Sequence, residues 1–172
     1  MRLILTDWPV LPPLPSEDEV AILCLSCPAP RPAMRRAARE AILAAARAWG
    51  YPDASLREQP TGPQLVGCGT WALSLSYAGD RAWIAFARRD TIGIDATEIR
   101  DFEGMREVAH TYLDPEENYA TAEAFADGWS RREAALKYHR LPLTEWRTDT
   151  PVPPRHLSVR AAGCAVSVAF GG

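Results

Sequence analysis

The sequence predicts an α+β protein in which two similar halves, residues 1–89 and 90–172, form one compact pseudo-dimeric domain. The main observation is a repeated order of patterns, because an apolar strand, a helix and a pair of alternating strands occur once in each half. A local echo accompanies the repeat, since AREAILA at 38–44 is matched by RREAALK at 131–137. The repeat favours halves related by a pseudo-two-fold axis, with a ligand bound at the seam.

The first half begins with the apolar run EVAILCLSC at 19–27, which is typical of a buried strand. A helix is expected over 31–50, and Gly50 is well suited to cap its carboxyl end. A loop rich in proline and glycine, around EQPTGPQ, follows this helix. The alternating residues of 71–87, with small residues and a glycine at their centre, then predict a hairpin.

The second half begins with TIGIDATEI at 91–99, a second apolar run of strand character. The polar stretch 100–121 has weak periodicity and fits either a helix or a loop. A helix is expected over 122–140, followed by a proline-rich loop over 142–154. The residues 156–170 again predict a hairpin, so that the order of elements is the same in both halves.

Composition and charge exclude several classes of protein. No apolar run approaches the ~18 residues needed to cross a membrane. The amino-terminal LILTDWPVLPPLP is interrupted by Asp7 and four prolines, which makes it a poor signal peptide. We therefore expect a cytoplasmic protein without membrane contact. The net charge of −3 argues against general binding of nucleic acid.

The cysteines and histidines do not form a metal-binding pattern. The pair in CLSC has the C-x-x-C spacing, but no second pair follows it and His110, His139 and His156 are scattered. A structural zinc site needs four ligands. Buried, unreactive thiols are the favoured interpretation of the cysteines.

Lys137 is the single lysine among 19 basic residues, and all the others are arginines. A GC-rich genome would convert lysine to arginine wherever either residue serves, so the survival of one lysine can be chance. The alternative is that position 137 needs an ammonium group that can lose its proton, which arginine cannot do.

Asp95 ends an apolar run, where a buried carboxylate needs a hydrogen bond, a cation or a metal. Glu133 and Lys137 lie four residues apart and share a helix face, which taken alone indicates an exposed ion pair. If that helix packs against the strand of Asp95, the two carboxylates converge. They could then bind a hard cation such as Mg²⁺ with positions open for phosphates, and Lys137 could serve a leaving phosphate.

The motif IGID at 92–95, followed by WSRREAALK at 129–137, resembles the signature of the 4′-phosphopantetheinyl transferases. Arg132 stands where the signature has its first lysine. The stretch WALSLSYAGDRAWIAFA is similar to a serine-containing element of the family, and Ser76 stands at the position of that serine. The two-half layout resembles the surfactin-type subfamily, whereas GIDATE is closer to the holo-acyl-carrier-protein synthase subfamily.

This resemblance implies the two-half fold of the family and the transfer of the 4′-phosphopantetheine arm from coenzyme A to a serine of an apo carrier protein. It implies Mg²⁺ as the cofactor, held by Asp95 and Glu133, and coenzyme A as co-substrate in the seam. Glu133 or a metal-bound water would deprotonate the serine, and Lys137 would stabilise or protonate the departing 3′,5′-ADP. Thr97 replaces a second carboxylate, and Glu98 is assigned a supporting role because its side chain points to the other strand face.

Two departures from the family bear on coenzyme A binding. The histidine that follows the serine is Tyr77 here, and the lysine of the family's GKP loop is Gly62. The residues expected to bind coenzyme A are Ser76, Tyr77 and Lys137, together with Arg35, Arg36 and Arg39 as candidates for its 3′-phosphate. Arg57 is a further candidate nearby, and a solvated helix face is the alternative interpretation of the helical arginines.

Two alternatives stay open beside the enzyme. One is a non-catalytic relative that binds carrier protein or coenzyme A, and the other is an interaction domain without a ligand. For the enzyme we expect a monomer that recognises an acidic carrier protein through the neighbourhoods of Arg131–Arg132 and His139–Arg140. Fatty-acid, polyketide and peptidyl carriers are all candidates, and the shortness of the chain favours a pathway-specific enzyme.

Overall fold

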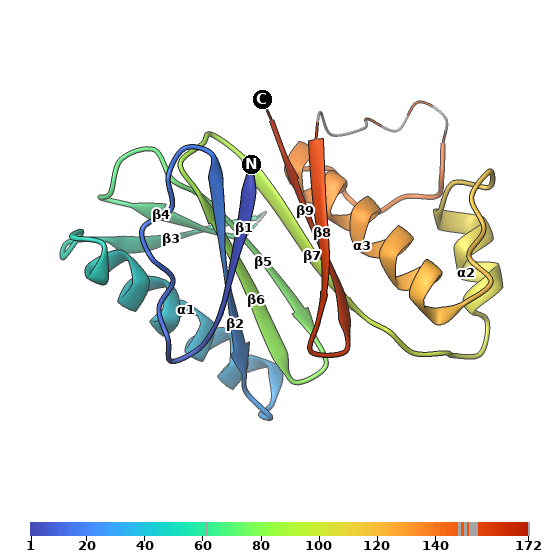
Figure 1. Cartoon of the computed structure of the whole chain (residues 1–172), viewed down its shortest axis with the longest axis horizontal. Helices are drawn as coiled ribbons and strands as arrows, with labels where there is room; N and C mark the ends of the chain where they lie inside the picture. Colours follow the sequence, from blue (N-terminus) through green and yellow to red (C-terminus); the bar gives the residue numbers. More distant parts are fainter. Residues whose placement is uncertain (61, 148, 150, 152–154, 172) are drawn as a thin grey trace. The chain divides into compact units, whose positions relative to one another are not determined.

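The protein is described by a computed structural model that covers residues 1–60, 62–147, 149, 151 and 155–171 (Figure 1). The chain divides into two compact units, Met1–Ile92 and Gly93–Gly172. The sequence had placed the division between residues 89 and 90. The proline-rich loop expected over 142–154 includes residues 148, 150 and 152–154, which lie outside the described part.

Unit 1 contains one helix and six strands among its described residues. They are β1 (Arg2–Asp7), β2 (Glu19–Ser26), α1 (Arg31–Ala48), β3 (Ser55–Gln59), β4 (Gly62–Val66), β5 (Ala72–Ala78) and β6 (Arg81–Ala87). Four strands form a sheet in the order β1-β2-β6-β5, and β3 pairs with β4 in a separate hairpin. β1 runs parallel to β2, whereas the other neighbours in the sheet are antiparallel.

Unit 2 contains two helices and three strands among its described residues. They are β7 (Ile92–Glu98, which begins one residue before the unit), α2 (Met105–Tyr112), α3 (Ala122–His139), β8 (Arg155–Ala161) and β9 (Cys164–Phe170). The three strands form a sheet in the order β7-β9-β8, and β8 and β9 are an antiparallel hairpin.

The predicted α+β class and the strand–helix–hairpin order are confirmed in each unit. The topology extends the repeat beyond the order of elements. In both sheets the second hairpin strand lies between the first strand and the first hairpin strand, which gives β2-β6-β5 in unit 1 and β7-β9-β8 in unit 2. The pseudo-two-fold axis and the family-specific fold stay predictions.

Three elements differ from the sequence-based expectation. The proline-containing amino-terminal segment begins with β1, which adds a parallel edge strand to unit 1. The segment around EQPTGPQ is part of the β3–β4 hairpin rather than a loop, although Thr61 lies outside the described residues. The stretch 100–121 contains the short helix α2, which begins after Gly104 in a left-handed conformation.

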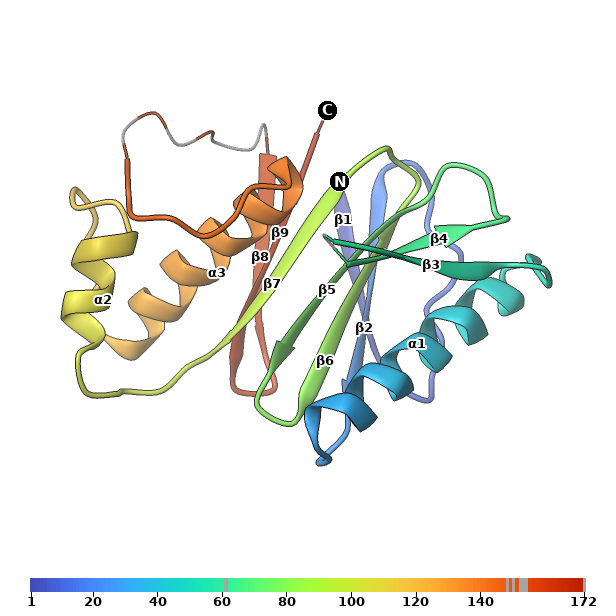
Figure 2. The same cartoon turned by 180° about the vertical axis from the view of Figure 1, so that it is seen from behind.

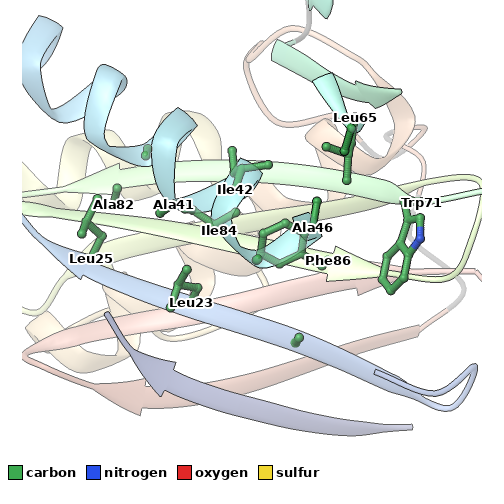
Figure 3. Packing of buried hydrophobic residues seen from close by; sticks show 14 of the residues in the cluster. Leu23, Leu25, Ala41, Ile42, Ala46, Leu65, Trp71, Ala82, Ile84 and Phe86 are labelled. Carbon is green, nitrogen blue, oxygen red and sulfur yellow. The ribbon is translucent and has the colours of Figure 1, made fainter. Parts of the chain in front are cut away.

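Helix α1 packs on one face of the unit 1 sheet (Figure 2). Its buried side chains are small or unbranched at most positions, and Ala41, Ile42 and Ala46 meet Ile84 and Phe86 of β6 in the core (Figure 3). The helix ends as the sequence predicted. Gly50 adopts φ +90°, and its N–H and that of the next residue donate to the carbonyls of the last helical turn.

Helix α3 is fixed at its start by a side-chain cap and along its length by a buried hydroxyl chain. The Thr121 hydroxyl accepts a hydrogen bond from the Ala124 N–H over 3.2 Å. Ser130 of α3 and Ser167 of β9 are fully buried, and their hydroxyl oxygens lie 2.9 Å apart. Ser167 in turn lies 2.8 Å from the Ser158 hydroxyl of β8. These bonds satisfy polar groups inside the unit and fix the helix against the sheet.

Gly93 of β7 allows a close approach between the strand and α3. A Cβ atom at Gly93 would overlap the carbonyl oxygen of Ala134 and would lie 2.6 Å from the amide nitrogen of Tyr138. Both atoms belong to the helix backbone and cannot move without distorting the helix. The glycine of the IGID motif is therefore required by packing, because any side chain would push α3 away from β7.

Among the described residues, none of the helices combines the length and the apolar character that crossing a membrane requires.

We predict that Gly93→Ala lowers the free energy of unfolding by about 3 kcal/mol, because the new methyl group overlaps helix backbone. Gly128→Ala is the matched control on α3. There the new methyl group meets the ring of Tyr119, a side chain rather than helix backbone, and alanine is favoured over glycine in a helix by about 1 kcal/mol. Urea unfolding of both variants measures the difference, and an equal loss in the two would contradict the proposed role of Gly93.

Candidate functional site

The side chains that carry the candidate site come from alternate positions of β7 and from one face of α3. Gly93, Asp95 and Thr97 lie on the same face of β7, because side chains alternate along a strand. Gly93 brings α3 close, and the next position on that face is Asp95, which is 6% exposed. The close approach therefore places a buried carboxylate directly beside the helix.

Lys137 of α3 forms an ion pair with Asp95. Its Nζ lies 2.7 Å from Oδ1 of Asp95, and it also donates to the carbonyl oxygen of Ile94 over 3.0 Å. The other carboxylate oxygen of Asp95, Oδ2, accepts a hydrogen bond from the Thr97 hydroxyl over 3.0 Å. Asp95 thus has a charged donor on one oxygen and a neutral donor on the other. These hydrogen bonds offset the free-energy cost of burying its carboxylate.

Glu133 is half-buried one helical turn before Lys137, and its environment disfavours its charge. Burial and the negative charge of Asp95 raise the pKa of the Glu133 carboxyl, and Lys137 and Arg132 oppose this rise only in part. Within the described part of the chain, its carboxylate makes no hydrogen bond or ion pair. The exposed Glu133–Lys137 ion pair, which the spacing alone favoured, is therefore replaced by a pair between Lys137 and Asp95.

Arg132, which was expected at a carrier-binding surface, is instead buried at 7% exposure. Its Nη2 donates to the carbonyl oxygens of Thr144 and Glu145 at 2.7 and 3.2 Å, and its guanidinium lies 5.1 Å from the centre of the Trp146 ring. Burial lowers the pKa of Arg132. The segment 141–147, here called the strap, is held against α3 by this residue.

Trp129 and the remaining residues expected at a carrier-binding surface make separate contacts. The Trp129 ring stacks on Phe125 and meets Tyr112 edge-on, which joins α2 to α3. Arg131 pairs with Glu117 over 2.6 Å. His139 is half-buried and Arg140, in a left-handed conformation, is exposed after the last helical residue. Of the four residues expected to contact a carrier protein, Arg140 is the one classed as exposed.

Arg35 and Arg39, proposed for the 3′-phosphate, lie one turn apart on α1, and Arg39 lies near Tyr77. Arg39 Nε donates to Glu58 over 2.7 Å, and its Nη1 donates to the carbonyl oxygen of Arg35. Tyr77 raises the pKa of Arg39 as a lesser contribution beside Glu58, which indicates that the phenol is close. The Tyr77 ring is covered by the guanidinium of Arg31, 4.8 Å from its centre.

The remaining candidates of unit 1 are not all on this face. Ser76 is buried and adjacent to Tyr77 in β5, so the two side chains point to opposite faces of the sheet. Arg36 is exposed and turned about 100° around α1 from Arg35. Arg57 is exposed on β3. The structure therefore brings Arg39 close to Tyr77 and to the backbone of Arg35, whereas Ser76 and Arg36 point elsewhere.

Glu98 lies outside the carboxylate site, as the alternation of β7 predicted. Its Oε2 is 3.5 Å from Nε of Arg100; the Arg100 side chain is largely exposed and that of Glu98 is half-buried. Because side chains alternate along a strand, residues three positions apart, such as Asp95 and Glu98, point to opposite faces of β7. Thr97, by contrast, points with Asp95 and donates to it.

The donor set of Asp95 and Glu133 fits a hard divalent cation that brings other ligands with it. Mg²⁺ is commonly held by one or two protein carboxylates and completes its octahedron with phosphate oxygens and water. No group of three or more acidic, histidine or cysteine side chains able to hold a metal occurs in the described ranges. Two neighbouring carboxylates are compatible with the magnesium expectation but are too few for a cage made of protein ligands alone.

A hollow of about 270 Å³ lies elsewhere in unit 2, beside α2. It is lined by Arg106 and His110 on the helix and by Asp114, Glu117 and Tyr119 on the loop that follows. Glu117 is already paired with Arg131. Asp95, Glu133 and Lys137 do not line this hollow, so it is separate from the carboxylate site.

Comparisons with known proteins add no family to this geometry. A scan against models of protein families finds none that matches the chain, and a search of curated proteins finds no match either. The candidate site therefore rests on its residues alone.

Sequence reasoning missed three roles in this site. As part of the IGID motif, Gly93 gives no role of its own, although a glycine within an apolar strand is a general sign of close backbone approach. Against the family pattern, Thr97 marks the loss of a ligand, although its position two residues after Asp95 is also that of a donor to this carboxylate. Arg132 gave no signal of burial, because the strap that covers it is not recognisable from the sequence.

We predict that Glu133→Gln raises the free energy of unfolding by about 1 kcal/mol at neutral pH, because it removes a charge that burial and Asp95 disfavour. Since the pKa of Glu133 is raised, the folded state holds its proton to higher pH than the unfolded state does. The stability of the wild type relative to the variant should therefore fall as pH rises above the ordinary glutamate range.

Chemical unfolding of both proteins between pH 4 and pH 8 measures this effect. Glu40→Gln, at an exposed position of α1, is the matched control and should leave the free energy of unfolding nearly unchanged. Asp95→Asn should have the opposite sign and lose about 2 kcal/mol, because it leaves the Lys137 ammonium without its ion pair. A destabilised Glu133→Gln would show that Glu133 is a structural residue.

Proposed function

We propose that this protein is a 4′-phosphopantetheinyl transferase, which moves the phosphopantetheine arm of coenzyme A to a serine of an apo carrier protein. The proposal joins the signature-like motifs of the sequence to the geometry of unit 2. Asp95, Glu133 and Lys137, which the motifs single out from positions up to 42 residues apart, gather at one strand–helix contact.

The observation that carries the proposal is that Glu133 places a second, half-buried carboxylate close enough to Asp95 for the two charges to interact. Burial and the neighbouring carboxylate raise the pKa of Glu133, and carboxyl groups with such shifts are frequent at functional sites. The two carboxylates together attract a divalent cation, and a carboxyl with a raised pKa is suited to accept a proton. Neutralisation of charge by a cation is a main requirement of a site that transfers a phosphoryl-type group.

In the proposed reaction, the carrier serine loses its proton to Glu133 and its oxygen forms a bond to the β-phosphorus of coenzyme A. The bond from that phosphorus to the bridging oxygen breaks, and 3′,5′-ADP leaves. Lys137 donates a hydrogen bond or a proton to the departing oxygen, since an ammonium can do both. Mg²⁺ held by Asp95 and Glu133 would supply positive charge to the diphosphate.

Unit 1, taken by itself, contains a basic group of a kind that binds phosphate. Arg31, Arg35 and Arg39 follow one another at four-residue intervals on α1, beside the phenol of Tyr77. Arg39 is partly neutralised by Glu58, and a phosphate would have to compete with that carboxylate. The Tyr77 hydroxyl can donate one hydrogen bond to a phosphate but supplies no positive charge.

This weakness in unit 1 favours a second candidate function, a relative that binds a carrier protein without transferring the arm. Tyr77 and Gly62 stand where the family has cations, and Glu58 reduces the charge of Arg39. The retained set of Asp95, Glu133 and Lys137 favours the enzyme over this alternative.

The transfer is tested by mixing the purified protein with coenzyme A, Mg²⁺ and apo carrier proteins of fatty-acid, polyketide and peptide synthesis. Mass spectrometry should find an adduct of ~340 Da on the serine of at least one carrier. Asp95→Ala, Glu133→Gln and Lys137→Met should each lower the rate by about 100-fold or more. Glu98→Gln, a carboxylate on the other strand face, should retain the wild-type rate.

The absence of an adduct on every carrier would rule out the enzyme. In that case, calorimetry that detects a carrier protein or coenzyme A without turnover would support the binding relative. An unchanged rate in Glu133→Gln would show that Glu133 takes no part in the transfer.

A further inference from the structure

We propose that the Lys137 ammonium occupies the cation position on Asp95 in the resting protein, so that the site accepts a divalent cation together with a diphosphate and discriminates against the bare ion. This inference rests on the proposed function for the assignment of Asp95 and Glu133 as cation ligands. It goes beyond it by assigning Lys137 a second, earlier role, in which it governs the form of the substrate that the site admits.

The first support is the geometry of the ammonium group. Nζ of Lys137 lies 2.7 Å from Oδ1 of Asp95 and 3.0 Å from the carbonyl oxygen of Ile94. It therefore makes direct contact with an oxygen that a cation between Asp95 and Glu133 would use. An ammonium and a divalent cation at the same carboxylate repel each other strongly over such short distances.

The second support is the balance of charge at the contact. Lys137 neutralises Asp95, so that Glu133 is the one carboxylate of the three-residue set left without a paired cation. A bare divalent cation would therefore leave this half-buried contact with a net charge of +1. A diphosphate arriving with the cation brings the negative charge that restores the balance.

The third support is the freedom of the lysine to change partner. The Lys137 side chain is 32% exposed, whereas the carboxyl of Asp95 is 8% exposed. The ammonium can therefore turn toward an incoming ligand while Asp95 stays in place, held by the hydroxyl of Thr97. Phosphate oxygens replace the acceptors that Nζ leaves, so no buried donor loses its hydrogen bonds during the exchange.

Removal of the ammonium should therefore improve binding of the metal alone. Titration of the metal-free protein with Mn²⁺, followed by calorimetry or by electron paramagnetic resonance, should show Lys137→Met binding at least about tenfold more tightly than the wild type. Arg140→Gln is the matched control, since it removes one positive charge three residues further along without touching Asp95. In the double variant with Asp95→Asn, the gain should disappear.

The wild-type protein provides a second test that does not depend on how the variants fold. Because Lys137 is the only lysine, labelling lysine with ¹³C at Cε gives one side-chain signal. This signal should change little when Mg²⁺ is added alone or sodium diphosphate is added alone. When both are present, the chemical shift of this signal should move away from the value of the ion-paired lysine. The chemical shift measured in Asp95→Asn gives the reference value for Lys137 without its ion pair.

Equal Mn²⁺ affinity in Lys137→Met and Arg140→Gln would overturn the inference, as would a lysine signal that Mg²⁺ alone shifts fully. Neither result decides the outcome of the transfer assay, which can still detect phosphopantetheinylation of a carrier protein. Conversely, a gain in Mn²⁺ affinity with no adduct on any carrier would keep the cation exchange and remove the proposed transferase.

Discussion

The distance between β7 and α3 is the constraint on which the candidate site depends. The strand and the helix can touch backbone to backbone because Gly93 has no side chain, and the next residue on that face is Asp95. A larger separation would leave Asp95 buried without the Lys137 ammonium and would reduce its effect on Glu133. One missing methyl group therefore determines the electrostatics of three ionisable side chains.

The side chains on different faces of α3 contact different parts of the protein. Trp129 faces α2, Ser130 faces the buried hydroxyl of Ser167, and Arg132 holds the strap. The face toward β7 carries Glu133 and Lys137, and there the chain accepts an unfavourable charge. The packing of the rest of α3 supplies stability that offsets this local cost.

The sequence was a good guide where a pattern is local and a poor one where partners come from afar. Buried strands such as β2 and the end of α1 at Gly50 follow from apolar runs and cap chemistry, and both were predicted. β1 was missed because its short run leads into prolines, and its strand character depends on pairing with β2. The convergence of Asp95 and Lys137 was expected from packing logic. The burial of Arg132 depends on the strap, and no local pattern announces it.

The parallel pairing of β1 with β2 has a consequence for the integrity of unit 1. β1 covers the side of β2 that would otherwise end the sheet, and β2 is almost wholly apolar between Val20 and Leu25. The connection back to β2 is stiffened by prolines and attached to the core, where Pro12 accepts a hydrogen bond from the Trp49 indole over 2.9 Å. A chain shortened to Glu19 would therefore expose an unpaired apolar strand edge, which is a common starting point for edge-to-edge aggregation.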